Sequence, residues 1–293
     1  MFRCDKCNKR AIISQRYSGM HLCRDHFHQD VHRKVRETLR QNKIFGRGAK
    51  VAVAMGGDKN SAVLLYILKD LFSRRRDIEF TAILIDQGLS GYSYNRLRCA
   101  KDLVDRLDVP YFVRSFKDVF GITADQMASQ LASQNHGLSI CMFCRDMRDA
   151  LLNRTALEMG ADVLAIGHGL DHEARIIFQC YLRGDIGRLF KIKTDQSREG
   201  LITRIEPLMR VPEREISLYS RTQGLCSLLI PNCSHSGDVM KRVTTKALSD
   251  FEHRHPGTKY SLLRSMERVI DLLPESADQK REVKAKPLSG GED

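Results

Sequence analysis

The chain has 293 residues, an apolar fraction of 42% and a charged fraction of 29%, which are ordinary values for one or two globular domains. No apolar run approaches the ~20 residues of a membrane span, and MFRCDKCNKR lacks the apolar stretch of a secretory signal, so a cytoplasmic protein without a membrane partner is expected. The net charge of +12 favours a polyanionic partner, most often nucleic acid, and nine cysteines in a reducing compartment indicate metal sites, catalytic thiols or buried core thiols.

Residues 1–30 predict a small zinc-binding module. Cys4 and Cys7 form one pair of candidate ligands, and Cys23 and His26 form a second pair with the same spacing. Each pair can place two ligands on one tight turn, and three thiolates with one imidazole suit a closed tetrahedral zinc site. So short a segment cannot fold by apolar burial alone, so metal binding would supply its folding free energy. The alternative is that the spacing of these cysteines is a coincidence. Neighbouring alternatives to His26 are His21, His28 and His32.

Residues 31–49 predict a linker helix, because apolar residues recur there at helical spacing between basic ones. Short apolar runs then alternate with amphipathic segments, a pattern typical of βαβ units around a parallel sheet. A nucleotide-binding domain is expected over 50–235, a helical C-terminal part over 236–273 and a disordered polar tail over 274–293. Expected strands are 50–55, 78–86, 110–116 and 161–169 (the last with a loop), and expected helices are 61–72, 95–107 and 144–160.

A glycine-rich turn joins the strand VAVAM to the helix that follows it. In this arrangement backbone amides and a helix N-terminus can hold phosphate. The spacing is not that of a Walker A motif, and an ordinary turn rich in small residues is the alternative. The candidate phosphate-binding residues are Gly56, Gly57, Asp58, Lys59, Asn60 and Ser61.

Cys141 and Cys144 lie at the start of a predicted helix, whose N-terminus stabilises thiolates and lowers their pKa. A second zinc half-site and buried core thiols are the alternatives for this pair. Three further cysteines fall at apolar positions of predicted elements and are expected in the core: Cys99, Cys180 and Cys226.

Taken in order, these motifs resemble the tRNA 2-thiolation enzymes of the TtuA and TtcA type. VAVAMGGDKNSAVLLYIL looks like the pyrophosphate loop (PP-loop) of ATP-pyrophosphatases, whose usual motif is Ser-Gly-Gly-x-Asp-Ser. The resemblance runs from Cys4 to about Leu273. It also rests on DQGLSGYS (86–93), CMFC (141–144), IGHGLDHEA (166–174), IEPLMRVPEREI (205–216), GLCSLLIPNCSHS (224–236) and HPGTKYSLLRSME (255–267).

The resemblance implies a doubly wound, Rossmann-like α/β fold of the adenine nucleotide alpha hydrolase type, with an N-terminal zinc ribbon and a helical C-terminal part. It also implies an ATP-dependent tRNA sulfurtransferase, in which the C2 oxygen of a uridine-type base is adenylated and sulfur then displaces AMP. The implied cofactors are ATP, Mg²⁺, Zn²⁺ and a 4Fe-4S cluster. The implied partners are tRNA and a sulfur donor (sulfide, a persulfide or a sulfur-carrier protein), with a homodimer as a possible assembly.

The same resemblance assigns roles to particular residues. Cys141, Cys144 and Cys233 would ligate the cluster, leaving one iron open to an exogenous sulfide; in other members of the superfamily such thiols carry a persulfide or form a disulfide. Arg148 stands where the family has a lysine proposed to assist the chemistry. The residues 56–61 would hold the phosphates, and the nucleotide and metal region would be lined by Asp86, Gly88, His168 and Asp171.

The PP-loop departs from the family motif at three of its six positions. Gly56 replaces serine, Asp58 replaces the second glycine and Asn60 replaces aspartate. A carboxylate at Asp58 would repel a phosphate unless it turned away or held Mg²⁺. Gly169 and His172 are further departures, and together they support an alternative, a non-adenylating RNA- or nucleotide-binding paralogue. A third hypothesis is an ATP-pyrophosphatase that acts on a small molecule.

No cysteine follows Cys233, so the second, C-terminal zinc module that the family often has is expected to be missing. Positive charge is spread over several clusters, and Lys and Arg neutralise phosphates without reading sequence. A solvated surface would explain each cluster alone, but their sum beside a zinc module favours RNA. The clusters are 74–76; Arg33, Lys34, Arg36 and Arg40; and Arg183, Arg188, Lys191 and Lys193.

Overall fold

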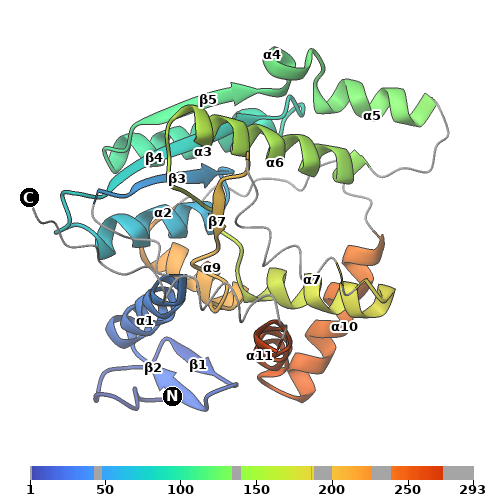
Figure 1. Cartoon of the computed structure of the whole chain (residues 1–293). Helices are drawn as coiled ribbons and strands as arrows, with labels where there is room; N and C mark the ends of the chain where they lie inside the picture. The colour runs from blue at the N-terminus through green and yellow to red at the C-terminus, as the bar shows by residue number, and fades with distance from the viewer. Residues whose placement is uncertain are drawn as a thin grey trace, which may run out of the picture.

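The computed structural model describes residues 2–42, 48–133, 140–185, 187, 200–225 and 239–272. The chain begins with a hairpin in which β1 (Ile13–Gln15) pairs antiparallel with β2 (Met20–Leu22). Helix α1 (Arg24–Asn42) follows directly and lies between the hairpin and the rest of the molecule (Figure 1). This helix begins seven residues earlier than the expected linker helix, so His26 belongs to its first turn.

The main sheet has five strands in the order β5-β4-β3-β6-β7, and every neighbouring pair is parallel. Along the chain, β3, β4 and β5 follow one another toward one edge of the sheet. The chain then returns to the other side of β3, where β6 and β7 extend the sheet toward the opposite edge. The order therefore reverses between β3 and β6, which confirms the doubly wound fold and marks a ligand-binding crevice at the carboxyl ends of these strands. The strands are β3 (Lys50–Met55), β4 (Glu79–Asp86), β5 (Tyr111–Ser115), β6 (Val163–Ala165) and β7 (Thr203–Ile205).

Both faces of this sheet are covered by helices, as the apolar runs of its strands require. Val51 and Val53 point into a core shared with α2, α3 and α9, whereas Ala52, between them, packs with Leu152 and Ala156 of α6. Figure 1 shows α6 on one side of the sheet and α2 and α9 on the other. These helices are α2 (Lys59–Leu71), α3 (Ser93–Arg106), α6 (Ile140–Glu158) and α9 (Glu213–Thr222).

The remaining helices lie at the periphery. Helices α4 (Phe116–Phe120) and α5 (Ala124–Ser133) follow β5 in a polar stretch where no helix was predicted. Helices α10 (Val239–Arg254) and α11 (Thr258–Asp271) form the expected helical C-terminal part and pack on α7 (Leu170–Arg183). None of the helices in the described ranges has the length and hydropathy that crossing a bilayer demands.

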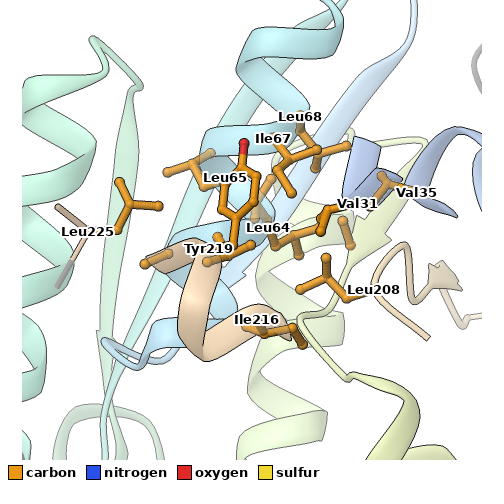
Figure 2. Close-up of a cluster of buried hydrophobic side chains, with 14 of the residues drawn as sticks. Val31, Val35, Leu64, Leu65, Ile67, Leu68, Leu208, Ile216, Tyr219 and Leu225 are labelled. Carbon is orange, nitrogen blue, oxygen red and sulfur yellow. The ribbon is translucent and has the colours of Figure 1, made fainter. Parts of the chain in front are cut away.

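The core continues from the nucleotide-binding domain into the N-terminal hairpin. Figure 2 shows Leu64 and Leu68 of α2 packed with Val31 of α1 and with Ile216 and Tyr219 of α9. Helix α1 is therefore a packed element of the main domain rather than a bare linker.

A buried polar network reinforces this contact. Lys34 of α1 donates to Glu215 of α9 at 2.6 Å and pairs with Asp30 at 2.8 Å, and the Lys34 side chain is only 6% exposed. Gln15 and Tyr17 of the hairpin region donate to the same Glu215 carboxylate. The prediction that Lys34 belongs to an exposed basic cluster is wrong, because it lies on the face of α1 that carries the buried valines.

Candidate functional site

The four predicted zinc ligands converge at the start of α1. Their ligand atoms all lie within 4.8 Å of one another. The Cys7–Cys23 sulfur distance is 3.7 Å, and His26 Nδ1 lies 3.4 Å from the Cys23 sulfur and 3.3 Å from that of Cys4. With Zn–S bonds of about 2.3 Å, the edge of a tetrahedron is about 3.8 Å, so these residues fit one zinc ion.

The neighbouring histidines have other partners. His21 stacks on Phe2, His28 contacts Thr222 at 2.8 Å, and His32 contacts the Tyr219 hydroxyl at 2.6 Å. His26 is therefore the histidine that the fold brings to the three cysteines. Burial raises the pKa of the Cys4 thiol, but hydrogen bonds from backbone amides and from His26 lower it to about 6, which favours the metal-binding thiolate.

A cavity of about 960 Å³ opens at the carboxyl ends of the strands, at the reversal between β3 and β6. This volume is within the range of cofactor and small-molecule sites. Of the predicted site residues, those that line it are Gly56, Asp58, Ser61, Arg148 and His168.

The PP-loop packs tightly against α3. Gly57 has φ +65°, and a Cβ at this position would lie 2.0 Å from the backbone carbonyl oxygen of Arg96. Asp58 is the N-cap of α2: its Oδ1 accepts from the Ser61 amide at 2.9 Å, and its Oδ2 accepts from Arg96 at 2.8 Å. The carboxylate has therefore not turned away from the loop, and it uses an amide that could otherwise face a phosphate.

Two side chains at the end of the loop are held by Glu213, the first residue of α9. Lys59 Nζ lies 2.6 Å from Glu213 Oε1, and Asn60 donates to Oε2 of the same carboxylate at 3.0 Å. Neither Lys59 nor Asn60 lines the cavity. Because Asp58 is committed to Ser61 and Arg96, the described loop residues do not form a ready Mg²⁺ site.

The loop after β4 is shaped by two other predicted residues. Asp86 Oδ1 accepts from the Gly88 amide at 2.8 Å, and Gly88 has φ +67° with Thr123 against it. Neither residue lines the cavity, whereas Gln87 between them does. Asp86 and Gly88 thus set the course of the backbone beside the cavity.

His168 follows β6 and is oriented by a carboxylate. Its Nδ1 lies 2.9 Å from Glu206 Oε1, and its ring stacks on His172 at 3.8 Å and an interplanar angle of 7°. Burial lowers the pKa of His172 to about 2, so this ring is neutral. His168, His172 and Glu173 are close enough to share a metal ion, but parallel rings cannot both direct an in-plane lone pair at one ion.

Asp171 joins two helices. It accepts from the Glu213 amide at 2.7 Å, which caps α9, and it pairs with Lys259 of α11 at 2.5 Å. It does not line the cavity, although it was predicted to border the nucleotide.

Cys141 and Cys144 lie in the first turn of α6, as predicted, and both are partly exposed. Three residues apart on a helix, their side chains share one face. Arg145 and Arg148 continue the same helix into the cavity lining. Cys99 and Cys180 are buried, as expected. Cys226, Cys233, Arg188, Lys191, Lys193 and the tail 274–293 lie outside the described residues.

Several residues of the site were not predicted from the sequence. Arg96, Arg145 and Arg204 line the cavity, and Glu206 and Glu213 hold predicted residues. Arg145 could have been found from its place beside the cysteine pair. Arg96 and Glu213 could not, because they act through elements that only the fold brings to the loop.

Two family models match this chain. The model described as the N-terminal LIM domain of 2-thiouridine synthetase TtuA matches residues 3–28, and the PP-loop domain model matches residues 27–226. The first covers the four converging candidate zinc ligands, and the second covers the parallel sheet and most of the residues that line the cavity.

Similar proteins agree with these matches. The chain is 31% identical to the tRNA 2-thiolation protein NcsA of Haloferax volcanii, over 92% of this chain and 87% of that one. It is 31% identical to the cytoplasmic tRNA 2-thiolation protein 1 of Caenorhabditis elegans, over 90% of this chain and 70% of that one. A solved structure, the U34-tRNA thiolase NcsA from Methanococcus maripaludis with its [4Fe-4S] cluster, superimposes with a TM-score of 0.84 at 29% identity and covers 93% of this chain and 88% of that one. The chain therefore belongs to the PP-loop family of tRNA 2-thiolation enzymes, the sulfurtransferases that the sequence motifs resemble.

Proposed function

We propose that the protein is a cytoplasmic tRNA 2-thiolation sulfurtransferase that uses ATP to activate the C2 oxygen of a uridine-type base. The C2 oxygen would attack the α-phosphorus of ATP, and pyrophosphate would leave. A sulfide would then add to C2, and the C–O bond would break to release AMP. The observation that carries the proposal is that one cavity is lined both by the PP-loop and by α6, the helix bearing Cys141 and Cys144.

The walls of the cavity suit the charges of this reaction. Ser61, in the first turn of α2, lines the cavity together with Arg145, Arg148 and Arg204, whose guanidinium groups are held by Asp146 and Asp149. Positive groups fixed in advance would bind the phosphates and stabilise negative charge that develops on the transferring group. Arg148 would act as a fixed charge rather than as a proton donor, since arginine does not lose its proton in proteins.

The first turn of α6 is the proposed sulfur site. Cys141 and Cys144, together with Cys233, would hold a [4Fe-4S] cluster, which would supply an iron open to an exogenous sulfide. The two cysteines of α6 lie on one helical face near the arginines of the cavity, which supports this assignment.

A tRNA partner is supported by the exposed face of α1. Arg33, Arg36 and Arg40 line a groove there, and Gln41 lines both this groove and the cavity. A phosphate backbone bound along α1 would therefore lead an exposed base toward the reaction site.

The alternative, a paralogue that binds RNA or a nucleotide without adenylating it, is favoured by one observation. The Asp58 carboxylate occupies the N-terminus of α2, where a nucleotide phosphate would bind. Pyrophosphate release that depends on tRNA separates the two functions, because only the sulfurtransferase requires it.

The decisive experiment uses anaerobically purified protein with ATP, tRNA and sulfide. Cys141→Ala is expected to remove the cluster absorbance and to reduce 2-thiouridine formation, measured by mass spectrometry, at least 100-fold. Met142→Ala is the matched control, because Met142 lies in the same turn and is 44% exposed. Loss of the cluster absorbance with unchanged thiolation in Cys141→Ala would refute the proposed mechanism.

A further inference from the structure

The carboxylate of Asp58 lies across the start of the PP-loop. One oxygen accepts from the Ser61 amide at 2.9 Å and the other accepts from Arg96 at 2.8 Å. A Cβ built at Gly56 would lie 3.0 Å from Asp58 Oδ2, so the carboxylate is folded back over the loop. The chain's own negative charge is therefore seated at the helix N-terminus.

Arg96 is fixed beside the loop by its surroundings. Its backbone carbonyl contacts Gly57, its guanidinium donates to the Tyr92 hydroxyl, and it lies over the Tyr92 ring at 4.7 Å from the centroid. Its side chain is 23% exposed, and its buried Nε atom has no hydrogen-bond partner among the described residues. Arg96 thus lines the cavity in a fixed position, with its terminal guanidinium nitrogens shared between the Asp58 carboxylate and the Tyr92 hydroxyl.

A helix N-terminus and a guanidinium are the groups that proteins commonly use to bind phosphate. Both groups are present at this loop, and both are engaged by Asp58. A phosphate that approached the same donors would meet a carboxylate at contact distance. Nucleotide binding here therefore requires that the Asp58–Arg96 pair separate.

We propose that Asp58 is an internal anion that competes with the nucleotide for the PP-loop, and that Arg96 is its phosphate-binding counterpart. When Asp58 leaves the loop, Arg96 and the Ser61 amide become available to the phosphates. This inference rests on the proposed function in one respect, because it takes ATP as the ligand of the loop. It makes Asp58 a determinant of nucleotide affinity whose removal strengthens binding.

The opposite role for Asp58 is that of a Mg²⁺ ligand, which would help MgATP to bind. The two roles predict opposite changes in affinity when the charge is removed. Asparagine and serine both retain the ability to cap a helix, so Asp58→Asn and Asp58→Ser remove the charge while α2 keeps its N-cap.

The test is isothermal titration calorimetry of the full-length protein with MgATP and with pyrophosphate. Asp58→Asn and Asp58→Ser are each expected to bind MgATP at least tenfold more tightly than the wild type. Adding Arg96→Ala to Asp58→Asn is expected to abolish the gain. Asp77→Asn is the matched control, because it breaks another aspartate–arginine pair, Arg75–Asp77 at 2.6 Å, that lies outside the cavity lining.

Unchanged binding by both Asp58 variants, with melting temperatures near that of the wild type, would overturn the inference. Weaker MgATP binding would overturn it in favour of the Mg²⁺ role. If the wild-type protein thiolates tRNA but the Asp58 variants do not bind MgATP more tightly, this inference alone is refuted. Tighter binding by the variants without tRNA-dependent turnover by any form would refute the proposed function and leave the inference standing.

Discussion

His172 lies face to face with His168, and burial holds its pKa far below that of a free histidine. A histidine that stays neutral in the folded state but takes up a proton in the unfolded state makes stability depend on pH. Neutral His172 leaves the stability of the fold undiminished above the pKa of about 6.5 that histidine has in the unfolded chain. As the pH falls below that value, the unfolded chain takes up a proton and the stability decreases. At the residue scale, then, one side chain of the cavity couples folding to acid.

This coupling predicts an acid-sensitive enzyme. Between pH 7 and pH 5 the free energy of unfolding is expected to fall by up to about 2 kcal/mol through His172 alone. In His172→Asn this part of the fall in the free energy of unfolding should disappear, as measured by urea unfolding at several pH values. Burial also lowers the pKa of His28, to about 4, so the free energy of unfolding of the variant should still fall with pH, but less steeply than that of the wild type. Identical slopes for wild type and variant would contradict this assignment.

Single residues also mark the limit of prediction from the sequence. The convergence of Cys4, Cys7, Cys23 and His26 and the position of the PP-loop could be predicted, because the spacing of these residues along the chain indicates which of them lie together. The burial of Lys34 could not, because its partner Glu215 is 181 residues away and a lysine among arginines on a helix suggests a solvated face. Glu213 was missed for the same reason: its partners Lys59 and Asn60 lie on another element.

At the scale of elements, α1 has two faces with different tasks. Val31 and Val35 are buried against α2 and α9, while Arg33, Arg36 and Arg40 are exposed on the opposite side. Within the described residues Arg36 and Arg40 form no ion pair, whereas Arg33 pairs with Asp30 and Glu37. The unpaired arginines are the ones best able to bind a phosphate backbone.

Reversing two of these charges tests the tRNA path. Arg36→Glu with Arg40→Glu is expected to weaken tRNA binding at least tenfold in 0.1 M salt and to reduce the slope of log K against log salt by about two. Arg74→Glu with Arg76→Glu is the control of equal charge on another exposed cluster. Filter binding at several salt concentrations measures both. Equal losses for the two pairs would show an effect of net charge rather than a path along α1.

The strands show what periodicity can predict. Continuous apolar runs such as KVAVAM gave the central strands to within a few residues, because both faces of a parallel sheet are covered. β7, only Thr203–Ile205, is too short to stand out from its loop and was not predicted. α4 and α5 were missed because their sequence is polar and their burial depends on β5 and α6.

For the whole molecule, the N-terminal segment with the four candidate zinc ligands packs into the same core as the nucleotide-binding domain, and we expect the two to unfold together. Their shared core includes Phe27 and Tyr219, and the Lys34–Glu215 pair lies within the contact. Because α9 also carries Glu213, which pairs with Lys59, this one helix contacts both the N-terminal segment and the PP-loop, and we expect a disturbance of the first to affect the second.

Loss of zinc should therefore destabilise the entire protein. Cys7→Ser is expected to lose zinc, measured by metal analysis, and to lower the single melting transition by roughly 5–10 °C, the shift for about 2–3 kcal/mol in a domain of this size. Lys9→Met, which breaks an exposed pair with Asp25 in the same module, should change it by less than about 2 °C. A separate early transition in calorimetry would instead show that the module melts on its own.

The contact between Lys34 and Glu215 also has a consequence for synthesis on the ribosome. The two residues are 181 positions apart. At about 5–20 residues per second, roughly 10–35 s pass between their emergence from the ribosome. During that interval the nascent chain exposes the apolar face of α1, and Lys34 has its neighbour Asp30 but not Glu215 as a partner, so the segment translated first is the one whose packing is completed late.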